Sequence, residues 1–252
     1  MELFVTTASL TTLALSTFVA IRLFVAALRT RGAPELAMGL YQGLIVTAIG
    51  LYTYLGAVSA TVEPAHVFDV VVTANLLIAL GVVALSIGVM RIYRASETWA
   101  RWLCSALVVW VLAGWASSSM GETLPTTVAA TIPNAFFVSG RSAVYLWGAY
   151  EGIRYASMLR RRAALGLGDP VIAHRILMWG LFSLTMGTLA IVSLGVGYAL
   201  GSTEGFNAWT PARFITPTLS LIASILLWLG FFPPVAYQRF VARRMETAQQ
   251  AS

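Results

Sequence analysis

Residues 66–94 read HVFDVVVTANLLIALGVVALSIGVMRIYR, and this stretch decides the class of fold. Between Asp69 and Arg91 it has no charged residue, so residues 70–90 form one apolar segment with only three polar side chains. An α-helix rises about 1.5 Å per residue, and ~20 apolar residues therefore cross the hydrocarbon core of a bilayer. The stretch predicts a transmembrane helix.

The rest of the chain repeats this pattern. Of 252 residues, 58% are hydrophobic and 10% are charged, whereas soluble domains carry about 45–50% apolar and about 25% charged residues. We therefore expect an all-α integral membrane bundle of seven transmembrane helices. It forms a single domain over residues 1–244, followed by a short polar cytoplasmic tail, 245–252. The apolar segments are residues 3–28, 35–60, 66–90, 99–120, 128–157, 173–200 and 212–238.

The placement of basic residues predicts the orientation of this bundle. The sequence has sixteen arginines and no lysine, and its net charge is +6. Basic residues are enriched in the cytoplasmic loops of membrane proteins. Fourteen arginines flank the first, third and fifth connectors or the tail, while Arg213 follows the sixth connector and Arg141 lies inside the fifth segment. This alternation predicts an N-terminus outside and a C-terminus in the cytoplasm, in a bacterial inner membrane.

Arg141 is the deepest ionisable residue of the expected fifth helix. It follows Pro133 by eight residues, which places it ~12 Å further along a helix. A charged group in lipid is costly and usually faces the bundle interior. Asp69 of the third helix is the expected partner. An Asp69–Arg141 pair either fixes helix packing or lines a pocket in the outer half of the membrane.

Polar and aromatic residues near this pair extend the expected pocket between the third, fifth and seventh helices. A pocket with one arginine, one carboxylate and several aromatic rings suits a small anionic or amphipathic ligand. The expected ligand-binding residues are Asp69, Arg141, Asn75, Asn134, Tyr145 and Arg213.

Glu151 is the second carboxylate inside an apolar segment. Arg154 follows it by three residues, so the two side chains share one face of a helix. The spacing favours a local pair that extends to the membrane surface. A proton-relay carboxylate is the alternative.

Small residues recur four positions apart, as in Gly39 with Gly43 and Gly148 with Gly152. This spacing lets helix backbones approach closely. It favours packing inside one bundle over formation of a homo-oligomer, which remains the alternative.

The sequence shows no pattern typical of an enzyme, metal site or cofactor. His66 and His174 fall at opposite expected membrane faces, so they cannot jointly bind a haem or a metal. The single cysteine, Cys104, excludes an intrachain disulfide. No histidine is placed to act as a base for Ser139 or Ser142. We predict no enzyme activity and no cofactor, and the basic charge is placed for the lipid bilayer rather than for nucleic acid.

Residues 154–182 read RYASMLRRRAALGLGDPVIAHRILMWGLF. This segment, about a tenth of the chain, resembles part of uncharacterised bacterial seven-helix proteins, a resemblance that implies no activity. Asp169 and Pro170 are expected to cap and start the sixth helix, with Arg175 lying back on the loop to make an ordered elbow. The residues expected to dock a cytoplasmic partner or anionic lipid are Arg160, Arg161, Arg162 and Arg175.

Seven helices in this orientation also resemble the plan of microbial rhodopsins and G-protein-coupled receptors, in topology alone. A retinal protein needs a lysine in its last helix. The absence of lysine from this sequence excludes a covalent retinal pigment.

Three functional hypotheses follow. The favoured one is a receptor-like sensor that binds a small ligand in the outer half of the bundle and signals through the arginine-rich loop to a separate protein. A small transporter or channel is the second, although polar residues other than Glu151 are few in the expected inner half. The third is a structural or accessory subunit of a membrane complex.

Overall fold

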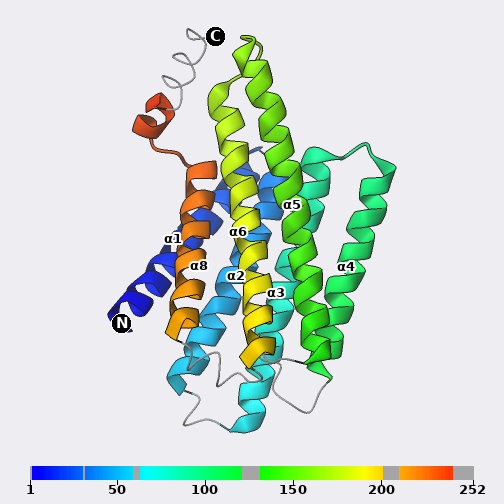
Figure 1. Cartoon of the computed structure of the whole chain (residues 1–252), viewed down its shortest axis with the longest axis vertical. Helices are drawn as coiled ribbons and strands as arrows, with labels where there is room; N and C mark the ends of the chain where they lie inside the picture. The colour runs from blue at the N-terminus through cyan, green and yellow to red at the C-terminus, as the bar shows by residue number, and fades with distance from the viewer. Residues whose placement is uncertain (1, 31, 59–62, 121–130, 201–209, 241–252) are drawn as a thin grey trace.

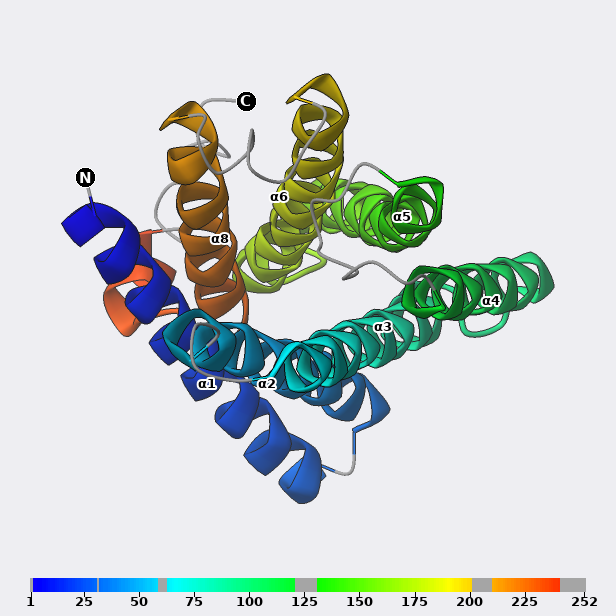
Figure 2. The same ribbon diagram turned by 90° about the horizontal axis from the view of Figure 1, so that it is seen from below.

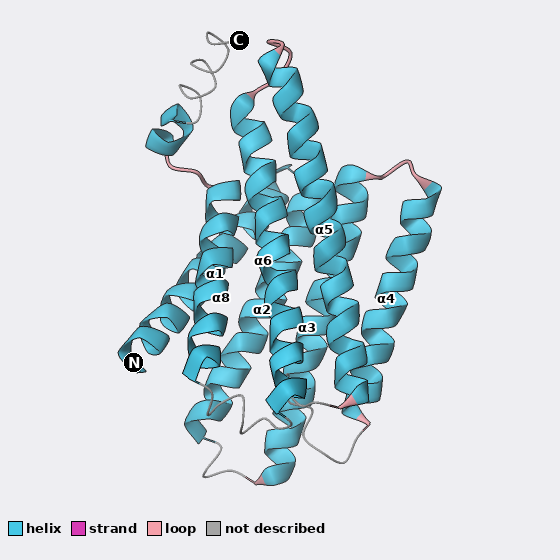
Figure 3. Ribbon diagram, in the orientation of Figure 1, coloured by secondary structure: helices cyan, strands magenta, loops and turns pink. Residues whose placement is uncertain are grey.

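The protein is a bundle of long helices that follow the apolar segments of the sequence. The computed structural model describes residues 2–30, 32–58, 63–120, 131–200 and 210–240, and in these residues the regular structure is helical (Figure 3). Each of the seven expected segments corresponds to one long helix, which confirms the all-α class. The helices are α1 (Glu2–Thr30), α2 (Ala33–Val58), α3 (Pro64–Tyr93), α4 (Thr98–Ser119), α5 (Ile132–Ala164), α6 (Pro170–Leu200) and α8 (Thr210–Phe231).

Most of these helices have the length and composition of membrane spans. Within the described residues, α1, α2, α3, α4, α6 and α8 each contain a segment long and apolar enough to cross a bilayer. These helices indicate an integral membrane protein. Helix α5 does not meet this criterion, because Arg141, Glu151, Arg154 and the arginines of its last turns interrupt its apolar sequence.

The helices are arranged as a ring in chain order. Each of these helices packs against the one given after it. Helix α8 also packs against α1, and α3 contacts α5 across the ring. Seen end on, α1 to α4 form one row that faces a second row of α8, α6 and α5 (Figure 2). Side chains buried between the rows include Tyr41, Tyr145, Phe137 and Leu85. Helix α5 therefore packs against α3, α4 and α6.

Glycines set the closest helix contacts. A Cβ added to Gly152 of α5 would lie 2.8 Å from the Cα of Gly180 in α6, and one added to Gly114 of α4 would lie 2.7 Å from the Cα of Phe137. Gly148 also faces α6, and Gly39 and Gly43 face α1. The small-residue pairs at 39/43 and 148/152 therefore pack within one chain, as predicted.

Helices α5 and α6 form a hairpin that extends beyond its neighbours (Figure 1). At about 1.5 Å per residue, the 33 residues of α5 span ~50 Å, well beyond a hydrocarbon core of ~30 Å. The turn is ordered by Gly166, whose φ is +72°, and by Asp169, whose Oδ1 accepts a hydrogen bond from the Val171 amide at 2.7 Å. The capped start of α6 at Asp169–Pro170 is confirmed.

Candidate functional site

Arg141 lies in the interior of the bundle without an ionic partner. Its guanidinium carbon is 5.2 Å from the centroid of the Phe137 ring, one helical turn earlier. Its Nε is buried and has no hydrogen-bond acceptor. Among the described residues, the one ion pair joins Arg94 to Glu151. A buried guanidinium nitrogen without an acceptor is costly to a folded protein, and a partly buried arginine without a counter-charge is suited to an external anion.

A cavity of about 310 Å³ opens beside Arg141. Its polar lining groups are the Arg141 guanidinium and the hydroxyls of Tyr52, Ser193 and Thr216, and the remainder of the wall is apolar. The cavity therefore has one cationic group and a few hydroxyls in a mainly apolar wall, which is typical of a small-molecule site. The lining residues come from α2, α3, α5, α6 and α8, and are Ile49, Tyr52, Ile78, Val138, Arg141, Met186, Leu189, Ala190, Ser193 and Thr216.

Two hydrogen-bonded pairs hold the polar residues around this cavity. The Tyr52 hydroxyl donates to Oδ1 of Asn75 at 2.9 Å. The hydroxyls of Tyr41 and Tyr145 lie 3.2 Å apart, and both rings are fully buried. Asn75 and Tyr145 were expected in the pocket wall but are not among its lining residues. Asn75 instead holds the hydroxyl of Tyr52, which does line the cavity, and Tyr145 holds that of Tyr41.

The expected Asp69–Arg141 pair does not form. Asp69 is exposed in the second turn of α3. Water or lipid headgroups can solvate its carboxylate there, so the carboxylate does not require Arg141 as a counter-charge. Asn134 is buried at the start of α5, where its backbone N–H donates to the Thr131 hydroxyl. Arg213 belongs to α8, but its side chain lies outside the described residues. Of the five expected ligand-binding residues whose side chains are described, Arg141 alone lines the cavity.

A second, smaller cavity adjoins the first. Its volume is about 50 Å³, and it shares the walls Ile49 and Met186 with the larger one. Its lining is richer in polar groups: Thr12 has a buried hydroxyl without a partner, and the hydroxyls of Ser16 and Ser224 lie 3.2 Å apart. Gln42, 4% exposed, also faces this space.

A partly buried ion pair lies toward the end of the bundle that carries the arginine-rich hairpin. Nε of Arg94, just after α3, donates to Oε1 of Glu151 in α5 at 3.0 Å, and this hydrogen bond raises the pKa of Arg94. Glu151 is buried, whereas Arg154 is exposed. The expected Glu151–Arg154 pair is therefore wrong: the packing of α3 on α5 brings an arginine from another helix to the buried face.

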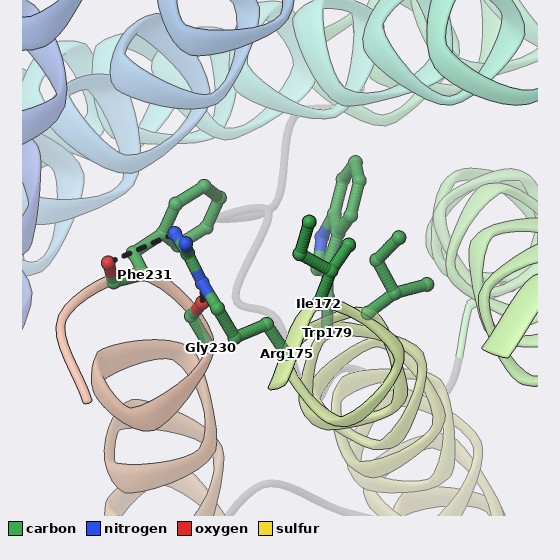
Figure 4. Close-up of a pocket in the computed structure, with 6 residues that line it drawn as sticks. Ile172, Arg175, Trp179, Gly230 and Phe231 are labelled. Carbon is green, nitrogen blue, oxygen red and sulfur yellow. Dashed lines mark hydrogen bonds between the residues drawn. The ribbon is translucent and has the colours of Figure 1, made fainter. Parts of the chain in front are cut away.

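A third cavity lies between α6 and α8 near the arginine-rich end. Figure 4 shows Arg175, Trp179 and Phe231 projecting from these two helices toward the middle of the bundle. The cavity measures about 180 Å³. Nε and an Nη of Arg175 donate to the carbonyl oxygens of Gly230 and Phe231 at 2.8 and 3.1 Å. Arg175 thus caps the C-terminus of α8 and does not lie back on the loop, because those carbonyls have no partner within their own helix.

The arginine-rich hairpin ends in an exposed surface. Arg160, Arg161 and Arg162 are all exposed, and Leu165 and Leu167 are 74% and 75% exposed. These side chains are therefore accessible at the surface of the hairpin. Arg175, in contrast, is engaged inside the bundle.

Sequence reasoning missed several wall residues for an identifiable reason. Tyr52, Gln42 and Met186 carry no charge, and nothing in their local sequence separates them from other residues of an apolar helix. The spacing of Gln42, Ile49 and Tyr52 along α2 does place them on one face, but spacing alone does not say which face is inside.

Comparisons with protein-family models, with curated proteins and with solved structures found no match.

Proposed function

We propose that this protein is a receptor-like membrane sensor that binds a small amphipathic anion in the cavity beside Arg141. The observation that supports the proposal is Arg141, which lines a cavity of about 310 Å³, has no ionic partner among the described residues, and keeps a buried Nε without a hydrogen-bond acceptor. An anionic group in the cavity pairs with the guanidinium of Arg141, and an apolar body fits the wall formed by Ile78, Val138 and Leu189.

The topology of the proposal is seven spans with the N-terminus outside and the C-terminus in the cytoplasm of a bacterial inner membrane. In this topology α5 also crosses the membrane, in addition to the six more apolar helices. Charged residues in a transmembrane helix are tolerated where they face the bundle interior, and buried Glu151 and partly buried Arg141 are of this kind. The arginine-rich hairpin then lies in the cytoplasm, where it reports the ligand to a separate protein partner.

Binding is tested with benzenesulfonate, a small amphipathic anion that stays charged at any working pH. The full chain is purified into lipid nanodiscs and titrated by calorimetry. A charge-assisted hydrogen bond contributes roughly 1.5–3 kcal/mol, so we expect Arg141→Gln to weaken binding by about 10- to 100-fold. Arg154→Gln, an exposed arginine of the same helix, is the matched control and should bind as the wild type does.

Equal affinities of the wild type and Arg141→Gln would overturn the proposal. In that case the protein would be better described as a structural or accessory subunit of a membrane complex, for which the cavity has no ligand.

A further inference from the structure

The three cavities follow one another along the inner faces of α6 and α8. On α6, the outer cavity is lined by Ser193 and Met186, the middle one by Met186 and Phe182, and the inner one by Trp179 and Ile172. These positions are separated by three, four or seven residues, the spacing of a single helix face. On α8 the order is the same, from Thr216 through Ser220 and Ser224 to Gly230. The cavities are therefore stacked along the bundle axis.

One residue in each cavity wall has a buried polar atom without a hydrogen-bond partner. These residues are Arg141 of the outer cavity, through its Nε, Thr12 of the middle one, through its hydroxyl, and Trp179 of the inner one, through its Nε1. Arginine and indole nitrogens are donors only, and a threonine hydroxyl can donate. All three positions are thus prepared for a hydrogen-bond acceptor.

The charges along the series have one sign. Arg141 lines the outer cavity and Arg175 the inner one, and none of the described residues that line the three cavities is a carboxylate. Glu151, the ion-paired carboxylate of the described residues, is not among the residues that line these cavities and is neutralised by Arg94. Two cationic side chains without a carboxylate between them favour anions and repel cations.

We infer that the three cavities form an anion translocation path along α6 and α8, so that the ligand site at Arg141 is its outer station. The substrate class is a small organic anion, such as a sulfonate or carboxylate. This inference rests on the proposed anion site at Arg141 and goes beyond a receptor, which needs the outer cavity alone.

The described structure corresponds to a closed state of this path. The middle cavity of about 50 Å³ is too small for an organic anion that fits the outer one of about 310 Å³. Met186 separates the two, and the ring of Phe182 packs edge-on against Tyr41 with centroids 6.0 Å apart. Methionine is an adaptable side chain, so passage requires Met186 and Phe182 to move aside.

The test is uptake of radiolabelled benzenesulfonate into liposomes that contain the purified full chain, driven by an inside-positive potential. Protein-free liposomes give the background. We expect uptake by the wild type well above this background. Two near-isosteric variants remove single donors from the middle and inner cavities: Thr12→Val and Trp179→Phe. Each should lower uptake roughly fivefold, the contribution of one neutral hydrogen bond, while binding measured by calorimetry stays unchanged.

Matched controls are available on exposed positions of the bundle. Thr11→Val and Trp102→Phe make the same chemical changes on exposed side chains, and both should take up the anion as the wild type does. Arg141→Gln should lose binding and uptake together.

The outcomes separate the two proposals. Binding without uptake leaves the ligand site standing and overturns the path. If the wild type shows neither binding nor uptake, the ligand site at Arg141 is overturned as well. Uptake that is unaffected in Thr12→Val and Trp179→Phe also overturns the path, because the anion then crosses elsewhere.

Discussion

At the scale of single residues, the Arg94–Glu151 ion pair is asymmetric, and this asymmetry can be measured. The Glu151 side chain is 4% exposed and that of Arg94 is 19% exposed. Removing the arginine leaves a buried carboxylate without a counter-charge, whereas removing the carboxylate leaves an arginine that reaches the end of the bundle. We expect Arg94→Gln to lower the free energy of unfolding by about 3 kcal/mol, near the low end for a broken buried pair, and Glu151→Gln by less. Reversible unfolding in detergent micelles measures both.

Two further variants make this prediction specific. The double variant Arg94→Gln/Glu151→Gln should be more stable than Arg94→Gln alone, since no buried charge is left unpaired. Arg154→Gln, which removes the arginine that local spacing favours, should leave the stability within about 0.5 kcal/mol of the wild type, as for other exposed positions. A larger effect of Arg154→Gln than of Arg94→Gln would contradict the pairing.

Arg141 and Asp69 show how far a sequence specifies a site. Arg141 is identifiable because it is the arginine that lies inside an apolar segment, and burial of a charge points to an interior position. Its partner is not identifiable. Sequence gives the depth of Asp69 in the membrane but not the rotation of α3, which turns that carboxylate outward. Arg94 was missed for the complementary reason: it meets Glu151 only through the packing of α3 on α5.

At the scale of elements, the crossing of α5 and α6 depends on two glycines in contact. A Cβ added to Gly180 would lie 2.9 Å from the backbone nitrogen of Ile153, and backbone atoms cannot rotate away as a side chain can. We therefore expect Gly180→Ala to destabilise the protein by about 1–3 kcal/mol, the usual effect of overpacking. Thermal unfolding followed by circular dichroism measures the change.

Gly195→Ala in the same helix is the control for this crossing. A Cβ at Gly195 meets nothing within 4 Å, and alanine is favoured over glycine in a helix by about 1 kcal/mol. This variant should be neutral or slightly stabilising. If both variants lower stability equally, the effect comes from helix α6 itself and not from its contact with α5.

The C-terminal end of α8 depends on a side chain from another helix. Arg175 supplies two hydrogen bonds to the last carbonyls of α8. We expect Arg175→Gln to increase the rate of amide hydrogen exchange in residues 226–232 by roughly tenfold, which corresponds to about 1.4 kcal/mol of local opening. Arg160→Gln, on the exposed hairpin, should leave this segment unchanged. Equal exchange in the wild type and Arg175→Gln would show that α8 ends without help from α6.

Elements were predictable where one physical effect dominates. Apolar length located the helices, and Asp169–Pro170 located the start of α6, because a capping carboxylate and a proline act within one turn. The projecting end of α5 does not follow from apolar length: the apolar segment ends at residue 157, yet the helix continues to Ala164. Arginine is a good helix former, so a change of polarity marked the membrane surface and not the helix end.

At the scale of the whole molecule, the arrangement of the helices agrees with the arginine pattern. The turn between α5 and α6 and the described turn between α3 and α4 lie at the same end of the bundle (Figure 1). This end carries Arg94, Arg101 and the Arg160–Arg162 cluster. In a bilayer, such an end is attracted to the anionic lipids of the cytoplasmic leaflet by about 1 kcal/mol per basic residue. The fold thus brings together the charges on which the predicted orientation depends.

The predicted orientation can be tested with single cysteines, because the one native cysteine, Cys104, is buried and 5% exposed. In a Cys104→Ser background, Glu63→Cys places a thiol at the start of α3, and Leu167→Cys places one on the arginine-rich hairpin; both positions are exposed. With the N-terminus outside, a membrane-impermeant maleimide should label Glu63→Cys in intact cells and Leu167→Cys only after the membrane is permeabilised. The reverse pattern would invert the topology and place the Arg141 cavity toward the cytoplasm. Labelling of both sites in intact cells would show that residues 63 and 167 lie on one side, which an odd number of spans between them does not allow.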